Sequence, residues 1–186
     1  MRPYRKALET IAVPWAIQHG FNRASAHVFH RTGSASGLVE VIELQKSCKH
    51  PHRTFTINLG LYHPSFTTDP SPSSADIASI HCARRIRIGH VMPKHFWSRL
   101  ALWFRFGSGW HWWAIFSGDF WWAYRDTDNS LSRAMSDALS QVARHGLPWF
   151  ERLASLRDAS EVFDRSRFGF YESVGFFPKK THKANQ

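Results

Sequence analysis

The segment Thr-Phe-Thr-Ile-Asn-Leu-Gly-Leu-Tyr at residues 54–62 constrains the fold most, because its side chains alternate between two kinds. Successive side chains of a β-strand point to opposite faces, so this period of two predicts a strand. One face would carry large apolar groups and the other polar or small ones: Phe55, Ile57, Leu59 and Leu61 against Thr54, Thr56, Asn58 and Gly60. We take this strand as the reference element of the fold.

Three further strands are predicted around it. We expect them at residues 26–31, 38–47 and 81–89, the last with Cys82, Arg84, Ile86 and Ile88 sharing one face. The strands up to residue 62 are consecutive and joined by short turns, which favours an antiparallel meander. A loop rich in Pro, Ser and Thr at residues 63–80 then leads to the fourth strand.

Helical periodicity marks the N-terminal region and the stretch after residue 129. Residues 4–19 space their apolar side chains as a helix does, although Pro14 should kink or split it. Residues 130–145 carry a full apolar stripe, Gly146 suits the position just past a helix end, and Pro148 opens a second helix. The predicted fold class is α+β: an antiparallel sheet of about four to five strands in a meander, with an N-terminal helix and C-terminal helices packed on one face.

Length and composition set further expectations. A chain of 186 residues fits one domain, which we place at residues 1–177, before a basic disordered tail at 178–186. Two cysteines are too few for a disulfide framework, which favours a reducing, cytoplasmic location. No apolar stretch approaches the roughly 20 residues that span a bilayer, so we expect no transmembrane segment, and peripheral membrane contact is not expected either.

Several short motifs, taken in order, resemble a bacterial family of unknown function. They are Gly20-Phe21, Gln45-Lys46-Ser47, Asn58-Leu59-Gly60, Arg85 to Gly89, Trp112-Trp113 and Gly146 to Trp149. Across residues 4–156 the chain is similar to the DUF4304 family, a domain of unknown function. The resemblance implies one α+β domain and supplies no catalytic residues.

Polar residues on the second and third strands form the main candidate binding site. Gln45, Lys46, Ser47 and Asn58 could meet on one face of adjacent antiparallel strands, and Arg85 and Arg87 would add positive charge if the fourth strand is adjacent. The functional interpretation is a binding face for an anion or a partner loop. The structural alternative, given equal weight, is that these side chains satisfy neighbouring backbone groups.

Seven tryptophans gather in residues 97–122, among them the pair Trp112 and Trp113, interleaved with arginines. We expect a helical turn near residues 94–105 and a strand near 110–116. Rings with arginine can stack on single-stranded nucleic acid or anchor a protein at a membrane surface. The commoner arrangement, which we favour, is that the rings pack under the helices.

The sequence carries no clear motif for metal binding, nucleotide binding or acid–base catalysis. Cys48, His50 and His52 alternate within a predicted turn, where alternate side chains need not converge, so we predict no metal site. Nucleotide-binding loops are absent from the sequence, and the scattered histidines and the carboxylates of Asp119, Asp126 and Asp128 mark no acid–base pair. We predict no catalytic residues and no cofactor.

The leading hypothesis is a non-enzymatic protein-interaction module, with a defence or immunity role as one form of it. The net charge of +10 favours an acidic partner over a basic one, by electrostatic complementarity. The same charge and the aromatic content support an alternative, a protein that binds nucleic acid or another polyanion. The third hypothesis is an enzyme of unknown reaction acting through the polar residues.

Overall fold

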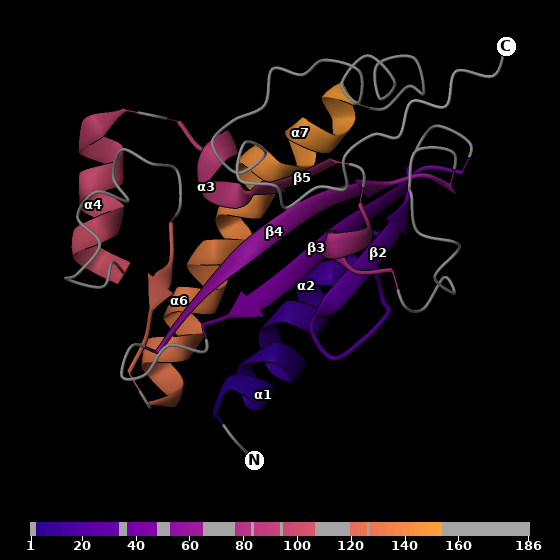
Figure 1. Cartoon of the computed structure of the whole chain (residues 1–186). Helices are drawn as coiled ribbons and strands as arrows, with labels where there is room; N and C mark the ends of the chain where they lie inside the picture. Colours follow the sequence, from indigo (N-terminus) through magenta and orange to yellow (C-terminus); the bar gives the residue numbers. More distant parts are fainter. Residues whose placement is uncertain are drawn as a thin grey trace, which may run out of the picture.

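The alternating segment is the central strand of the sheet in a computed structural model of the chain, which describes residues 3–33, 37–47, 53–64, 77–82, 84–93, 95–106, 120–125 and 127–153. Strands follow one another as antiparallel neighbours in the order β1-β2-β3-β4-β5, and β6 also pairs with β4 (Figure 1). Their bounds are Asn22–Arg23 (β1), Val28–Thr32 (β2), Val39–Lys46 (β3), Thr54–Tyr62 (β4), Arg84–Arg87 (β5) and Trp122–Ala123 (β6). The predicted meander is confirmed.

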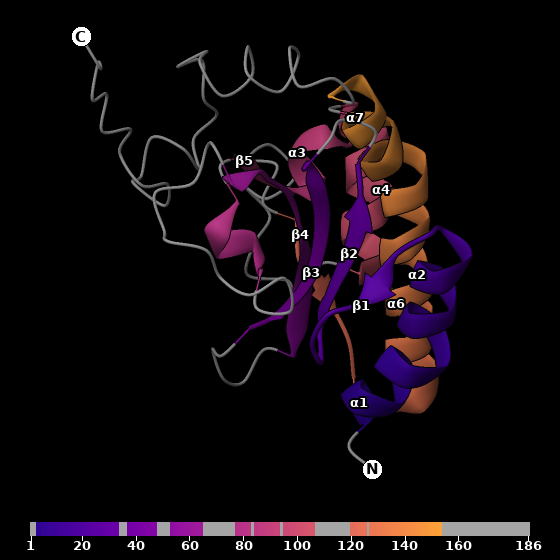
Figure 2. The ribbon, with the colours of Figure 1, turned by 90° about the vertical axis from the view of Figure 1, so that its right-hand side faces the viewer.

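One face of the sheet is covered by two long helical segments, one from each end of the described chain (Figure 2). The first runs through α1 (Pro3–Ala7), η1 (Leu8–Ala12) and α2 (Val13–Gln18). The second runs through α6 (Asp128–Gln141), η4 (Val142–Gly146) and α7 (Leu147–Arg152). The α+β class with N-terminal and C-terminal helices is therefore confirmed.

Each of these segments contains a proline, and a widened turn accommodates it. A proline inside a regular α-helix removes a hydrogen bond and strikes the carbonyl four residues earlier. Just before Pro14 the Val13 amide donates to the Leu8 carbonyl, five residues back, and just before Pro148 the Leu147 amide donates to Val142 in the same way. These π-helical turns let both helices continue past their prolines.

Gly146 therefore does not lie beyond a helix end, as its sequence position predicted. It lies inside the continuous segment with an ordinary helical φ of −74°. A Cβ atom added there would stand 3.0 Å from Cγ1 of Val142 and 3.2 Å from Cδ1 of Leu59. The glycine is required by the close approach of helix and sheet, whereas Gly20, with φ of +78°, does end the first helical segment as expected.

The fourth predicted strand is shorter than expected. Strand β5 covers only Arg84–Arg87; a short helix, η3 (Ser79–His81), precedes it and α3 (Ile88–Val91) follows. Since Cys82 lies before the strand begins, it packs with Val41 on the face opposite to Ile86, so the prediction that Cys82, Ile86 and Ile88 share one strand face was wrong. The predicted helical turn near 94–105 is α4 (Phe96–Phe106).

The main core lies between the sheet and the two helical segments. Its fully buried members include Phe21, Phe29, Phe55, Trp122 and Phe150, with the inward side chains of β4. A second, smaller cluster lies on the other face of the sheet and consists of Val28, Val41, Tyr62, Ile77 and Cys82.

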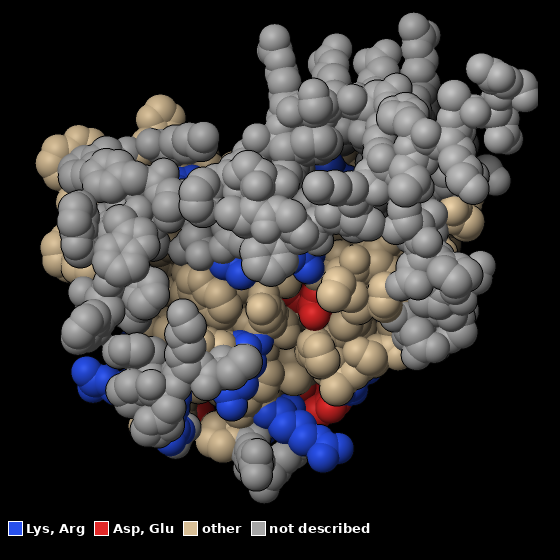
Figure 3. Space-filling model, in the orientation of Figure 1, with Lys and Arg blue, Asp and Glu red and all other residues tan. Residues whose placement is uncertain are grey.

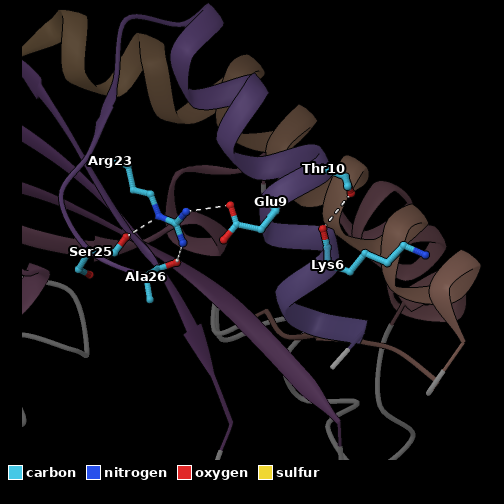
Figure 4. Close-up of polar contacts among 6 residues, drawn as sticks. All are labelled: Lys6, Glu9, Thr10, Arg23, Ser25 and Ala26. Atoms are coloured by element: carbon cyan, nitrogen blue, oxygen red, sulfur yellow. Dashed lines mark hydrogen bonds and ion pairs between the residues drawn. The ribbon is translucent and has the colours of Figure 1, made fainter. Parts of the chain in front are cut away.

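Arg23 fastens the N-terminal helical segment to the edge of the sheet (Figure 4). Its guanidinium lies between two elements: Nη1 is 2.9 Å from Oε2 of Glu9, while Nε and Nη2 donate to the carbonyls of Ser25 and Ala26 at 2.9 and 3.1 Å. Because the guanidinium of Arg23 forms an ion pair with the helix and also donates to two turn carbonyls, it fixes the path of the chain from β1 to β2.

Four predictions fall outside the described residues: the strand near 110–116, the Trp112–Trp113 pair, the group Cys48, His50 and His52, and the tail at 178–186. No helix among the described residues is long and apolar enough to cross a membrane.

Candidate functional site

The face of the sheet that points away from the helices carries a row of polar side chains across three strands. Strand register places Glu43 of β3 opposite Asn58 of β4, and Asn58 opposite Arg87 of β5. The next rows place Gln45 opposite Thr56, and Arg85 opposite Gly60. We call Glu43, Gln45, Thr56, Asn58, Arg85 and Arg87 the polar patch.

The amides of Gln45 and Asn58 are joined directly. Asn58 Nδ2 donates to Gln45 Oε1 at 3.0 Å, which links diagonal neighbours on adjacent strands. Asn58 is only 4% exposed, whereas Gln45 is half-buried. The side chain of Gln45 is therefore the more accessible end of this pair.

Glu43 connects the patch to the segment at residues 77–82, which lies over this face of the sheet (Figure 2). The Ser79 hydroxyl donates to Oε2 of Glu43, and Nε2 of His27 lies 3.9 Å from Oε1. The Ile77 carbonyl is 2.5 Å from Nε2 of His30 on β2. These contacts hold η3 against the sheet, and Ile80 at its centre is 63% exposed.

Arg85 and Arg87 form the β5 side of the patch. The Arg87 guanidinium lies over the Trp121 ring, 4.8 Å from its centroid, a cation–π arrangement. Next to it, the Thr56 hydroxyl donates to the Phe120 carbonyl at 2.9 Å. The segment that enters β6 thus packs on this face beside Arg87.

Cys82 packs over Gly60 on this face of the sheet, and its burial disfavours the reactive thiolate. Burial raises the pKa of its thiol well above the ordinary value, the Glu43 carboxylate adds to that rise, and Arg85 opposes it. A thiol that stays protonated is a poor nucleophile. Its Sγ also occupies the space over Gly60, where an added Cβ would lie 2.5 Å away.

The structure brings together some of the predicted site residues and separates others. Gln45, Asn58, Arg85 and Arg87 share one face, as the sequence suggested. Lys46 does not: it points to the helix-covered side, where its Nζ lies 5.7 Å from the centroid of the Tyr4 ring. Ser47 follows the end of β3, and its backbone amide donates to the Thr54 carbonyl at 2.9 Å.

Sequence reasoning missed Glu43 as a member of the patch, and His27, Ser79 and Trp121 as its neighbours. Glu43 had a usable signal, since it lies two residues before Gln45 on the same strand and must therefore share its face. Ser79 and Trp121 had none, because each lies outside a regular strand and reaches the patch through tertiary packing.

The described part of this face mixes both signs of charge. In Figure 3, Lys and Arg atoms lie close to Asp and Glu atoms among neutral residues. Among the described residues, no group of three His, Cys, Asp or Glu side chains is placed to hold a metal ion. The arrangement can donate and accept hydrogen bonds and form ion pairs with a ligand that itself carries mixed polarity.

A comparison with protein families agrees with the motifs on these strands. The model of a domain of unknown function, DUF4304, matches residues 12–152, well over half of the chain. The chain belongs to the DUF4304 family. The match contains every strand of the sheet, and so the DUF4304 domain includes the whole polar patch.

Neither a search of curated proteins nor a search of solved structures found a match to this DUF4304 chain. The family description names no activity or ligand, so inferences about its function depend on the geometry of the patch.

Proposed function

We propose that this DUF4304 protein is a non-enzymatic protein-interaction module that binds its partner through the polar patch and the adjoining Ile80. The observation that carries the proposal is the combination of an exposed apolar side chain with hydrogen-bonding groups and both signs of charge on one face. Protein interfaces typically have this composition, with apolar anchors inside a polar rim.

Ile80 is well placed to act as the anchor. Its neighbours Ile77, Ser79 and Cys82 are buried, and Ser79 is held by Glu43, so the surroundings of Ile80 are fixed before a partner arrives. A pre-positioned anchor loses little conformational freedom on binding, which improves affinity. Gln45, Arg85 and Arg87, all half-buried, would then supply contacts at the rim.

Glu43 makes a polyanion a poorer ligand for this face than a protein. Phosphate groups are attracted by Arg85 and Arg87, but a carboxylate in the row opposite Asn58 repels them. A protein surface can pair with both signs at once. The sequence-based alternative of nucleic-acid binding therefore gains no support from this part of the molecule.

Ser79 and Cys82, two candidate nucleophiles described on this face, have structural roles. Ser79 is buried and its hydroxyl is bound to Glu43, while Cys82 is buried with a raised pKa. Nucleophilic catalysis needs an accessible nucleophile next to a general base. These contacts support a binding role over the enzymatic hypothesis.

The net charge of +10 favours an acidic partner, which is part of the proposal. An immunity or defence role in a bacterium would suit a small binding domain, and identification of the partner tests that extension.

The test compares two exposed isoleucines on opposite sides of the molecule. Ile80 is 63% exposed beside the polar patch, and Ile17 is 66% exposed on α2 in the helical layer. A partner is captured from a lysate of the source organism, with and without nuclease treatment. It is then identified, purified and titrated against wild type, Ile80→Ser and Ile17→Ser by calorimetry. We expect Ile80→Ser to weaken binding about tenfold or more and Ile17→Ser to leave it unchanged.

Equal affinity of both variants for the purified partner would contradict binding at this face. Recovery of nucleic acid alone, lost on nuclease treatment, would replace the proposal with the polyanion hypothesis. The melting temperatures of both variants serve as the control for folding.

A further inference from the structure

The α4 helix exposes two large aromatic side chains and buries a charged one. Trp97 is 77% exposed and Phe104 is 74% exposed, the two highest values among the large hydrophobic residues described. Arg99, by contrast, is 4% exposed. With about 100° of rotation per residue, the exposed positions fall on one continuous arc of the helix: Trp97, Ser98, Ala101, Phe104 and Arg105. We call this arc the aromatic face of α4.

Arg99 fixes which side of α4 faces outward. Its guanidinium donates to the carbonyls of Gly89 and Met92 at 2.6 and 3.2 Å, and its Nε donates to that of Pro93 at 3.0 Å. These bonds satisfy carbonyls at the end of α3, and burial lowers the pKa of Arg99. Because Arg99 is held inward, the opposite arc with Trp97 and Phe104 is turned outward.

The sequence that contains α4 carries basic residues and no acidic ones. Between Asp76 and Asp119 there is no Asp or Glu, whereas six Lys and Arg residues lie between positions 84 and 105. Arg105, exposed at the border of the aromatic face, belongs to this set. A surface of aromatic rings and basic groups without acidic ones is complementary to an apolar layer edged with negative charge.

We propose that the aromatic face of α4 docks on the surface of a membrane that contains anionic lipids. Trp97 and Phe104 would enter the headgroup region, where aromatic side chains are favoured, and Arg105 would contact lipid phosphates. The two rings are seven residues apart on one arc, about 10 Å along the helix, so a flat surface can meet both at once. The helix lies at the side of the molecule, away from β2 and β3 (Figure 1).

This inference is independent of the proposed protein-binding role, which uses the polar patch. It also revises an expectation from the sequence. Peripheral membrane contact was not expected, and the rings of residues 97–122 were expected to pack under the helices, whereas Trp97 and Phe104 are exposed.

The test is co-sedimentation of the full chain with two kinds of vesicle, one of phosphatidylcholine alone and one of phosphatidylcholine mixed with phosphatidylglycerol. We expect partitioning to be at least about tenfold stronger on the mixed vesicles. The double variant Trp97→Ser/Phe104→Ser should lose about tenfold or more of that partitioning, and Arg105→Gln about fivefold. Ile17→Ser, which removes another exposed apolar side chain, 66% exposed on α2, should leave it unchanged.

Equal binding of wild type and the double variant to mixed vesicles would overturn the proposal, as would no binding to them at all. Two further readouts identify other occupants of the same face. If the double variant abolishes self-association in sedimentation equilibrium, or binding to single-stranded oligonucleotides, while vesicle binding is unchanged, the face serves a second copy or nucleic acid instead. Circular dichroism of each variant controls for folding.

Discussion

The two faces of β4 are buried to a similar degree, yet they are built differently. On the helical side, Phe55, Ile57 and Leu59 pack into one large apolar core. On the other side, Thr56 and Asn58 hydrogen-bond to Phe120 and Gln45, and Gly60 lies under Cys82. Burial on the first face comes from one large apolar core, whereas on the second it comes from satisfied polar groups, a close backbone approach and the small cluster around Tyr62. The first face therefore supports stability, and the second leaves groups from which a site can be built.

The largest effect should come from the helical face. Leu59→Ala removes a fully buried side chain that also borders Gly146, so a cavity would remain between sheet and helix. We expect the free energy of unfolding to fall by about 3 kcal/mol, as for other large-to-small changes in a core. Chemical denaturation measures this change, and a loss below about 1 kcal/mol would show that the core refills the space.

A change at Gly60 should have the next largest effect, for a reason of its own. The new Cβ of Gly60→Ala would stand 2.5 Å from Cys82 Sγ, and overpacking of this kind costs about 1 to 3 kcal/mol. The double variant Gly60→Ala/Cys82→Ala removes the obstructing sulfur and should recover part of the loss. The denaturation midpoints of Gly60→Ala, Cys82→Ala and the double variant complete a double-mutant cycle. If the stability losses of the two single variants simply add up in the double variant, the proposed contact between these positions is contradicted.

The hydrogen bond of the polar patch should contribute less. Asn58→Ala removes the donor to Gln45, and we expect a loss of about 1 kcal/mol. A double-mutant cycle with Gln45→Ala isolates the pair, because both single variants break the same bond. Zero coupling would mean that the two amides are adjacent without stabilising each other.

The smallest effect concerns pH and a carboxyl on the helical face. Burial raises the pKa of Glu40 above 4.5, against the lowering influence of Arg31, whose Nε donates to Glu40 Oε2 at 2.7 Å. Because the pKa of Glu40 is higher in the folded state than in the unfolded state, protonation of this carboxyl favours folding. Its contribution to the free energy of unfolding is fully present below the unfolded pKa and is lost as pH rises through the folded pKa.

Glu40→Gln should therefore remove a downward slope of stability with pH. The measurement is the difference in unfolding free energy between wild type and Glu40→Gln across a pH series beginning below 4.5. If wild type instead becomes more stable relative to Glu40→Gln as pH rises, the pKa of Glu40 is lowered in the folded state, and the influence of Arg31 outweighs that of burial.

The sheet was predictable because its signal is local. The alternation at residues 54–62 gave the bounds of β4 and the faces of Asn58 and Leu59. The same period of two places Lys46 on the face opposite to that of Gln45, so the local pattern already contradicts the expectation that both side chains share one face. Contacts of Glu43 with Ser79, and of Arg87 with Trp121, depend on where segments distant in sequence are laid across the sheet, which no local pattern encodes.

The widened turns before Pro14 and Pro148 make two pairs of features depend on each other. Without the wide turn, the proline ring would strike the preceding turn of the helix. Without the proline, the wide turn would keep its poorer hydrogen-bond geometry although a regular helical turn could then form in its place. Each turn also holds one residue more than a regular helix needs, and the widening absorbs that residue without turning the two halves of the helix relative to each other. Deleting a single residue from either turn would therefore leave both apolar stripes on the core, and the cost would fall on the proline, whose ring would strike the preceding turn of a regular helix.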